Sequence, residues 1–262
     1  MKTIAHVGLG SNLDDRRGHL GRAIESLRKA DGCGRLTVSR YFETKPVGGP
    51  PGQQPYLNAA AEVETDLSAV ELLELLQSIE HQEGRVRHEH WGERTLDLDL
   101  LLLGDQVIKT DRLVVPHPRM TLRMFVLAPL ATIAPEAIEP RSGKCIRELL
   151  ANCQARPGVI DLPGWKSVAP DAFSELALAL SNADWLIQDS LSKNENHKPT
   201  PTFRVIWKEA GEELGALATI SSDWPPRVKV DTSSKKIAIL EVLTTAEATR
   251  SAGSFVQIEP LA

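Results

Sequence analysis

Over residues 3–103, the spacing of hydrophobic residues changes twice from a strand-like to a helical pattern and back. This feature constrains the fold of the chain more than any other. The strand-like segments are 3–9, 36–43, 56–65 and 95–103, and the segments with helical spacing are 14–30 and 68–83. The resulting order, β-α-β-β-α-β, predicts an α+β fold of the ferredoxin-like type, an antiparallel sheet with both helices on one face. Such a fold implies no function by itself.

The second of these helices has the clearest local signals. Ser68 is its expected N-cap, and Glu71, three residues later, completes a capping box. Its apolar stripe is expected to comprise Val70, Leu73, Leu76 and Ile79. The residues around it are irregular: 45–55 is rich in Pro and Gly and predicts a loop long enough to act as a flap, and 84–93 is a polar turn.

The character of the sequence changes after residue 150, which predicts two domains, 1–155 and 156–262. The second is expected to be a small α/β region with helices at 171–185 and 234–250, a polar linker at 190–202 and strands at 203–207 and 227–230. It is too short for a (β/α)8 barrel and contains no G-x-x-x-x-G-K-[ST] loop. Its last predicted strand is faintly similar to the C-terminal end of P-loop nucleoside kinases, but without a phosphate loop no function follows.

Charge and cysteine content exclude several classes of partner. The net charge of −5 and the lack of a basic run argue against binding to nucleic acid or to a membrane surface. Cys33, Cys145 and Cys153 are an odd number without a C-x-x-C pair, which indicates free thiols in a reducing compartment. The apolar run at the N-terminus is too short for a signal peptide, and 98–103 is too short for a membrane span. We therefore expect a cytoplasmic protein.

Two aspartates in the last predicted strand of the sheet are the main candidates for chemistry. Alternate residues of a strand share a face, so Asp97 and Asp99 project together while Leu96, Leu98 and Leu100 point into the core. The two carboxylates are then roughly 7 Å apart, at about 3.3 Å of rise per residue. Oxygen ligands at that separation can hold one or two Mg²⁺ ions.

Arginines 85, 87 and 94 lie in the turn before this strand. Carboxylates that bind magnesium and guanidinium groups that bind phosphate oxygens are the groups that phosphoryl transfer requires. The alternative is a solvated strand face with ordinary ion pairs, which an Asp-x-Asp pattern alone does not exclude.

Other candidates are ambiguous when taken singly. His117 stands between two prolines, where a structural role is common, and Phe125 is as consistent with a core as with a stacking surface. Asn58 offers a donor and an acceptor that suit the edge of a flat heterocycle, but it could equally bond the backbone.

Taken together, five motifs in order resemble 6-hydroxymethyl-7,8-dihydropterin pyrophosphokinase over residues 3–150. They are Gly10-Ser11-Asn12-Leu13, Tyr56-Leu57-Asn58-Ala59, Gly84-Arg85-Val86-Arg87, the segment His90 to Leu101, and Pro116-His117-Pro118-Arg119. The chain departs from a well-known member of the family at Pro118, where that protein has a tyrosine, and in the turn 84–94, which is one residue shorter.

The resemblance implies a role for each matching position. Asp97 and Asp99 would hold two Mg²⁺ ions on the phosphates of ATP, and Arg85 and Arg94 would close over the transferring group. The positions that match ATP contacts are Gln77, Glu80, Arg87, Trp91, Arg112, His117 and Arg123. The positions that match pterin contacts are Thr44, Val47, Tyr56, Asn58 and Phe125, with the rings of Tyr56 and Phe125 on either side of the pterin.

The family resemblance implies an ATP-dependent diphosphotransferase of folate biosynthesis whose partners are two small molecules. The pterin hydroxymethyl oxygen would attack the β-phosphorus of ATP and release AMP, with catalysis by alignment and charge stabilisation. A monomer is expected, and no partner can be assigned to the C-terminal region. Two alternatives stay open: a related enzyme that uses another acceptor, and a ferredoxin-like interaction module without activity.

Overall fold

The computed structural model describes residues 2–47, 52–85, 93–155, 158–161, 185–188, 203–207, 227–230 and 256–258. Its first elements are β1 (Thr3–Ser11), α1 (Arg16–Lys29), β2 (Cys33–Val38), β3 (Tyr41–Thr44), β4 (Tyr56–Thr65), α2 (Ala69–Gln82) and β5 (Asp97–Leu103). The predicted second strand is thus two strands. Between them, Ser39 Oγ accepts a 2.9 Å hydrogen bond from the backbone N–H of Ala60, and this side chain replaces a regular ladder contact with β4.

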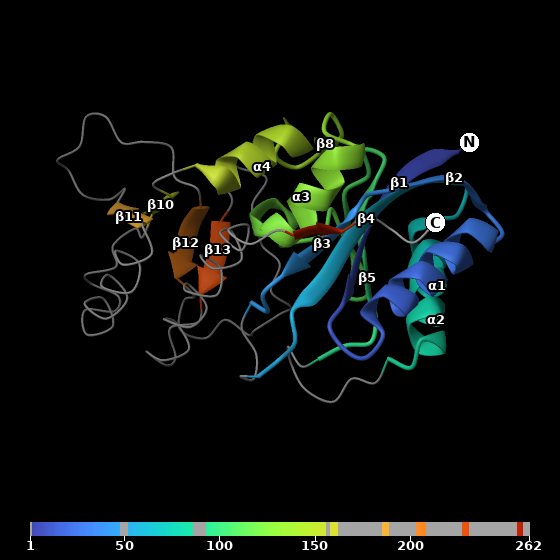
Figure 1. The fold of residues 1–262 in the computed structure, drawn as a ribbon. Helices are drawn as coiled ribbons and strands as arrows, with labels where there is room; N and C mark the ends of the chain where they lie inside the picture. The colour runs from blue at the N-terminus through green and yellow to red at the C-terminus, as the bar shows by residue number, and fades with distance from the viewer. Residues whose placement is uncertain are drawn as a thin grey trace.

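The central sheet has the order β14-β3-β4-β1-β5, with β2 also paired to β4, and every pair in it is antiparallel. The N-terminal strands therefore have the ferredoxin-like arrangement, and the α+β prediction is confirmed. Helices α1 and α2 lie together on one face, as expected (Figure 1).

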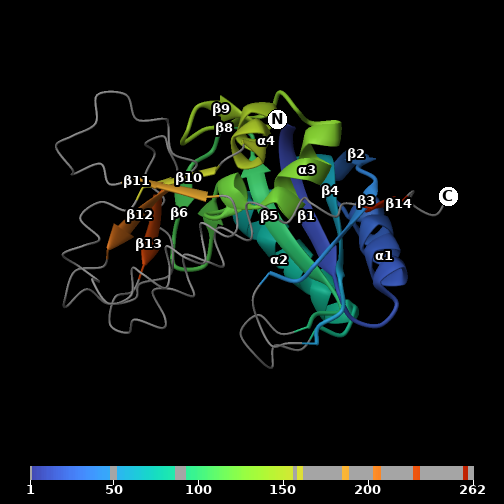
Figure 2. The same ribbon diagram turned by 60° about the vertical axis from the view of Figure 1, so that its left-hand side comes forward.

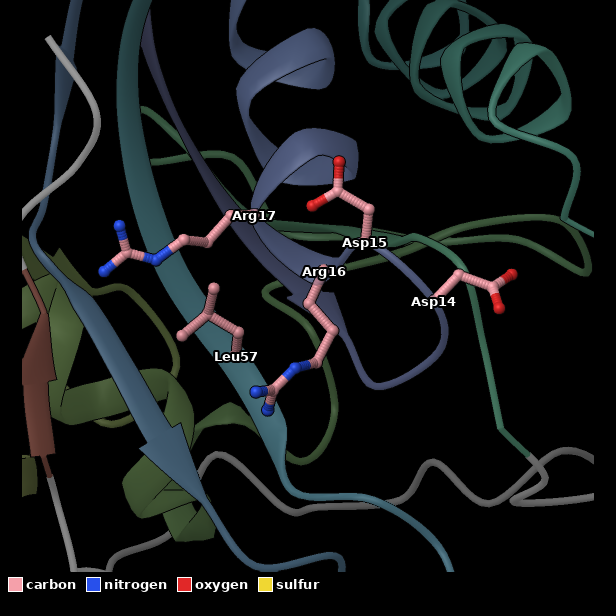
Figure 3. A pocket seen from close by; sticks show the side chains of 5 residues that line it. All are labelled: Asp14, Asp15, Arg16, Arg17 and Leu57. Atoms are coloured by element: carbon pink, nitrogen blue, oxygen red, sulfur yellow. The ribbon is translucent and has the colours of Figure 1, made fainter.

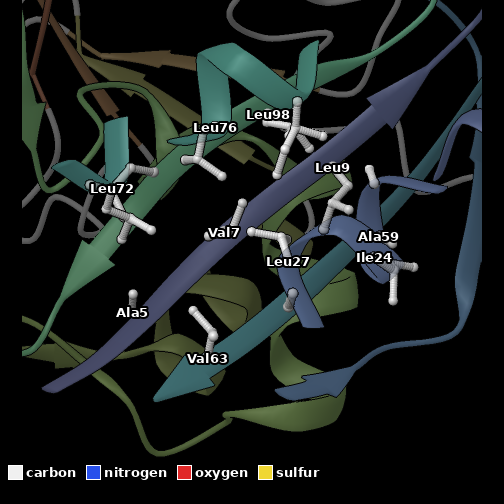
Figure 4. Packing of buried hydrophobic residues seen from close by; sticks show 14 of the residues in the cluster. Ala5, Val7, Leu9, Ile24, Leu27, Ala59, Val63, Leu72, Leu76 and Leu98 are labelled. Carbon is white, nitrogen blue, oxygen red and sulfur yellow. The ribbon is translucent and has the colours of Figure 1, made fainter. Parts of the chain in front are cut away.

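The opposite face of the sheet is covered by two helices that the sequence analysis did not anticipate, α3 (Met124–Ile133) and α4 (Ile146–Gln154) (Figure 2). Figure 4 shows the core on the first face, where Val7, Leu27 and Leu76 meet. A second core lies between the sheet and α3 and α4. Because both faces are covered, Leu100, Leu101, Leu102 and Leu103 are all buried. The residues at the end of β5 therefore do not alternate between buried and exposed positions.

Helix α2 has the predicted capping box, in which Ser68 and Glu71 bond each other's backbone N–H groups. Its buried stripe differs by one position from the prediction: Ala69, Leu72, Leu76, Ile79 and Glu80 are buried, whereas Val70 is 50% exposed. This rotation of the helix directs Glu80 inward.

Short elements connect the larger ones. They are β6 (Ile108–Lys109), β7 (Val114–Val115), the 3₁₀ turn Met120–Leu122, β8 (Ile138–Glu139) and β9 (Lys144–Cys145), with β6 paired to β7 and β8 to β9. Among the described residues, no helix combines the length and the apolar character that a bilayer crossing requires.

In the C-terminal part, four parallel strands form a second sheet of order β11-β10-β12-β13 (Figure 1). They are β10 (Gly158–Asp161), β11 (Trp185–Gln188), β12 (Phe203–Trp207) and β13 (Arg227–Val230). The strands predicted at 203–207 and 227–230 agree with the structure, whereas β10 and β11 were not predicted. The expected helices at 171–185 and 234–250 and the linker at 190–202 fall outside the described residues, except that Trp185 begins β11.

The last strand, β14 (Val256–Ile258), does not join the parallel sheet. It pairs antiparallel with β3, with Val256 opposite Glu43 and Ile258 opposite Tyr41. The C-terminal part of the chain therefore returns to the edge of the first sheet, and the division at residue 155 stays a prediction.

Candidate active site

Asp97 and Asp99 share one face of β5, and Leu98 between them is buried in the core on the α2 side. The aspartate side chains are 22% and 36% exposed. A Cβ added at Gly10 of β1 would lie 3.9 Å from Asp97 Cβ and 3.3 Å from Asn58 Oδ1. Three adjacent strands thus bring the acidic pair and Asn58 together on the face away from α1 and α2, and the absence of a side chain at Gly10 leaves space between them.

Two arginines hold the carboxylate of Asp97. Arg85 Nη2 lies 2.7 Å from Oδ1, and Arg94 Nη1 lies 2.7 Å from Oδ2. Burial acts to lower the pKa of Arg94, but Asp97 and other negative groups raise it above its ordinary value. The guanidinium of Arg94 is therefore charged, and both arginines lie at the first of the two predicted metal ligands.

Glu80, on the buried side of α2, supports this arrangement. It is 5% exposed, accepts a 2.7 Å hydrogen bond from the backbone N–H of Leu98, and pairs with Arg85 Nη1. Burial raises the pKa of this carboxyl group, although the bonds from Leu98 and Arg85 oppose the shift. Glu80 therefore connects α2 to β5 and fixes Arg85.

His117 and Arg123 face the second aspartate. His117 Nε2 lies 3.7 Å from Asp99 Oδ2, and Arg123 Nη1 lies 3.8 Å from the same oxygen. Burial, together with the positive charge of Arg123, lowers the pKa of His117 to about 3, so the ring is neutral at pH 7. The backbone N–H of Arg119 donates to Nδ1 at 3.2 Å, which leaves the ring proton on Nε2, directed towards Asp99.

A second group of polar and aromatic residues lies beside the acidic pair. Asn58 Nδ2 donates a buried 2.8 Å hydrogen bond to Thr44 Oγ1, so the amide orientation is fixed and its oxygen remains for another donor. The guanidinium of Arg123 lies over the ring of Phe125, 5.5 Å from its centroid. Burial raises the pKa of Tyr56; the positive charge of Arg94 opposes this shift, and the negative charge of Asp97 adds to it.

Residues 6–135 match the family 7,8-dihydro-6-hydroxymethylpterin-pyrophosphokinase (HPPK). A Haemophilus influenzae protein, 2-amino-4-hydroxy-6-hydroxymethyldihydropteridine pyrophosphokinase, is 43% identical over 146 residues, which are 56% of this chain and 90% of that protein.

This chain belongs to the HPPK family. Two further proteins with the same description support the assignment. The Bacillus subtilis protein is 48% identical over 51% of this chain and 79% of its own length, and the Pseudomonas aeruginosa protein is 42% identical over 61% and 96%. The match to the HPPK family ends at residue 135 and does not extend to the parallel sheet.

Other predicted HPPK site residues have no contact with the acidic pair that fixes their role, or fall outside the described residues. Gln77 is exposed on α2, and Arg112 is 67% exposed and pairs with Glu74 of α2 at 3.4 Å. Val47 is half-buried shortly after β3. Arg87, Trp91 and parts of both predicted loops fall outside the described residues, so their roles stay predictions.

Asn12 is a site residue that the sequence analysis did not assign, although it belongs to one of the HPPK motifs. It is fully buried and exchanges two hydrogen bonds with the backbone of Arg94, one through its own N–H and one through its Oδ1, while its Nδ2 donates to Gln53 Oε1 at 3.2 Å. It thereby holds an arginine of the acidic cluster and a residue of the flap to the end of β1. Its place directly after a predicted strand was the available signal.

A separate cavity of about 230 Å³ lies at the start of α1 (Figure 3). It is lined by Asp14, Asp15, Arg16, Arg17 and Leu57. Leu57 points to the face of β4 opposite Tyr56 and Asn58, because successive strand residues alternate. This cavity is therefore distinct from the acidic cluster.

The acidic pair fits magnesium chemically. Carboxylate oxygens are the ligands that Mg²⁺ prefers, and this ion commonly takes only one or two of them, together with water and substrate phosphates. Asp97 and Asp99 are thus suited to a metal that arrives with a nucleotide.

Proposed function

We propose that this HPPK transfers the pyrophosphoryl group of ATP to the hydroxymethyl oxygen of 6-hydroxymethyl-7,8-dihydropterin and releases AMP, as part of folate biosynthesis. The observation that carries the proposal is the placement of two arginines on Asp97 and of His117 and Arg123 beside Asp99. Four cationic or donor side chains around two carboxylates match the requirements of polyphosphate chemistry.

Asp97 and Asp99 would hold two Mg²⁺ ions with ATP. When bound, such ions neutralise the phosphate oxygens and align the triphosphate for in-line displacement. Since Arg85 and Arg94 already occupy Asp97, the metal must compete with them for its oxygens. Released from Asp97, both arginines would be free to bind the oxygens of the transferring group, and Glu80 would keep Arg85 within reach.

The remaining residues would orient the two substrates. His117, with its proton on Nε2, is a donor to a phosphate oxygen and not a base, and Arg123 adds charge nearby. On the pterin side, Asn58 Oδ1 would accept from a ring N–H, supported by Thr44, while Val47, Tyr56 and Phe125 would supply apolar contact. The rate enhancement would then arise from alignment and fixed charge.

An AMP-release assay on the full chain tests the proposal. ATP, Mg²⁺ and the pterin together should yield AMP. Chelation of divalent cations should abolish AMP release without changing the melting temperature, because the proposed ions arrive with ATP. AMP release with a different alcohol but not with the pterin would favour the related-enzyme alternative. Failure to bind ATP with Mg²⁺ would favour the inactive module. We also propose that the protein is a cytoplasmic monomer. Size-exclusion chromatography with light scattering would test whether it is a monomer.

A further inference from the structure

A buried carboxylate organises the turn between β8 and β9. Glu139 is 1% exposed, and it accepts hydrogen bonds from Ser142 N at 2.7 Å and from Arg141 N and Nε at 3.3 and 3.2 Å. A buried carboxylate is unfavourable unless its oxygens are satisfied in this manner. The pairing therefore fixes the direction of the Arg141 side chain, which is itself only 13% exposed.

From this fixed position, Arg141 reaches the loop that carries His117. Its Nη2 donates a 3.0 Å hydrogen bond to the carbonyl oxygen of Pro116. On the other side, the backbone N–H of His117 donates to Leu101 O of β5 at 2.9 Å. The peptide between Pro116 and His117 is thus held by β5 at one atom and by Arg141 at the other.

We propose that Arg141, oriented by Glu139, is a positioning residue for the nucleotide: by holding Pro116 it keeps the His117 ring beside Asp99. The inference rests on the proposed function of the site, and it assigns a role to the β8–β9 turn. Arg141 acts through His117 and does not itself touch substrate.

Steady-state kinetics of AMP release by Arg141→Met test this role. The Michaelis constant for ATP should rise about fivefold, the factor expected for the loss of one hydrogen bond, while kcat changes by less than about twofold. Arg141→Lys keeps the positive charge but lacks the planar set of N–H donors of the guanidinium group. Its Michaelis constant for ATP should therefore lie between those of the parent and of Arg141→Met.

Arg147→Ala is the matched control. Arg147 of α4 forms an exposed ion pair with Glu136, with Nη2 3.0 Å from Oε2. This variant should have the same Michaelis constant for ATP as the parent. A rise equal to that of Arg141→Met would overturn the proposal, because it would reflect a general effect of losing an arginine pair.

The imidazole NMR resonances of His117, assigned with a His117→Gln variant, give a readout that does not depend on activity. They should shift in Arg141→Met and stay unchanged in Arg147→Ala. If Arg141→Met does not fold, Glu139→Gln can be used instead, because it weakens the contacts that orient Arg141. The His117 resonances should shift in this variant too. A parent protein that releases no AMP would refute the proposed function, whereas active variants with unchanged ATP constants and unchanged His117 resonances would refute the role of Arg141.

Discussion

Asn12 and Arg94 exchange two hydrogen bonds across the end of β1: Asn12 N donates to Arg94 O at 3.1 Å, and Arg94 N donates to Asn12 Oδ1 at 2.8 Å. An arginine that we propose binds a phosphate is thus held at its backbone by a buried asparagine. The side chain of Arg94 remains free to change partner while its main chain stays in place.

Asn12→Ala should therefore lower kcat for AMP release. The variant removes the acceptor for Arg94 N, so the arginine loses its alignment, and misplacement of this kind can reduce a rate by about ten- to a hundredfold. Stability should fall by about 1–3 kcal/mol, because a buried donor loses its partner. Rates measured well below the melting temperature separate the two effects. A fully folded variant with the parent kcat would show that Arg94 needs no anchor.

Asp97→Asn should reduce AMP release by about a hundredfold or more, the range found when one preorganised electrostatic group is removed. The amide keeps the shape of the side chain but neither attracts a cation nor balances Arg85 and Arg94. Asp105→Asn, at the exposed turn after β5, is the control and should retain the parent rate. Parent activity in Asp97→Asn would refute the metal assignment.

The features that could be predicted from the sequence are those set by residues that lie close together along the chain. Asp97 and Asp99 were placed correctly because alternation along a strand is a property of neighbouring residues. Helix α3 was missed because it is apolar on all sides and contains Pro129, so it lacks the amphipathic stripe that marks a surface helix.

Contacts distant in sequence could not be predicted. The inward direction of Glu80 follows from a one-position rotation of α2 that depends on its packing against β5. Arg141 meets Pro116 only because the β8–β9 hairpin folds back 25 residues later. No periodicity in the sequence indicates either contact.

Thr44→Val should weaken pterin binding more than ATP binding. Valine preserves the shape but cannot accept the buried hydrogen bond from Asn58 Nδ2, which costs about 1–3 kcal/mol and frees the amide to turn. Thr44→Ser keeps the hydroxyl and should behave like the parent. Calorimetric titration of both variants with the pterin checks this. Equal pterin affinity in Thr44→Val would exclude Asn58 from ring recognition.

Glu83 should make stability depend on pH. It joins α2 to α1 through Arg22, with Nη2 2.8 Å from Oε2, and through His19, and the bond from Arg22 is the main cause of its lowered pKa. A lowered carboxyl pKa contributes stability above the ordinary value of about 4.5, and this contribution is lost as pH falls through the folded-state value.

Urea unfolding of the parent and of Glu83→Gln measures this contribution. The difference should be about 1 kcal/mol at pH 7 and should shrink below about pH 4. Glu25→Gln, an exposed acid that pairs within α1, should show almost no difference at either pH. A Glu83→Gln difference that stayed constant with pH would mean that packing, and not charge, joins the two helices.

Ending the chain at Ser254 should destabilise the first sheet, because β14 pairs with the edge strand β3. Without it, the backbone groups of β3 become an open edge, which favours association of chains. Since Thr44 ends β3, pterin affinity should fall as well, whereas a chain ending at Ile258 should match the parent. Thermal melting and light scattering on both truncations check this. If the shorter chain melts and scatters like the parent, the C-terminal strand contributes nothing to the sheet, and the domain containing residues 1–155 is independent of the rest.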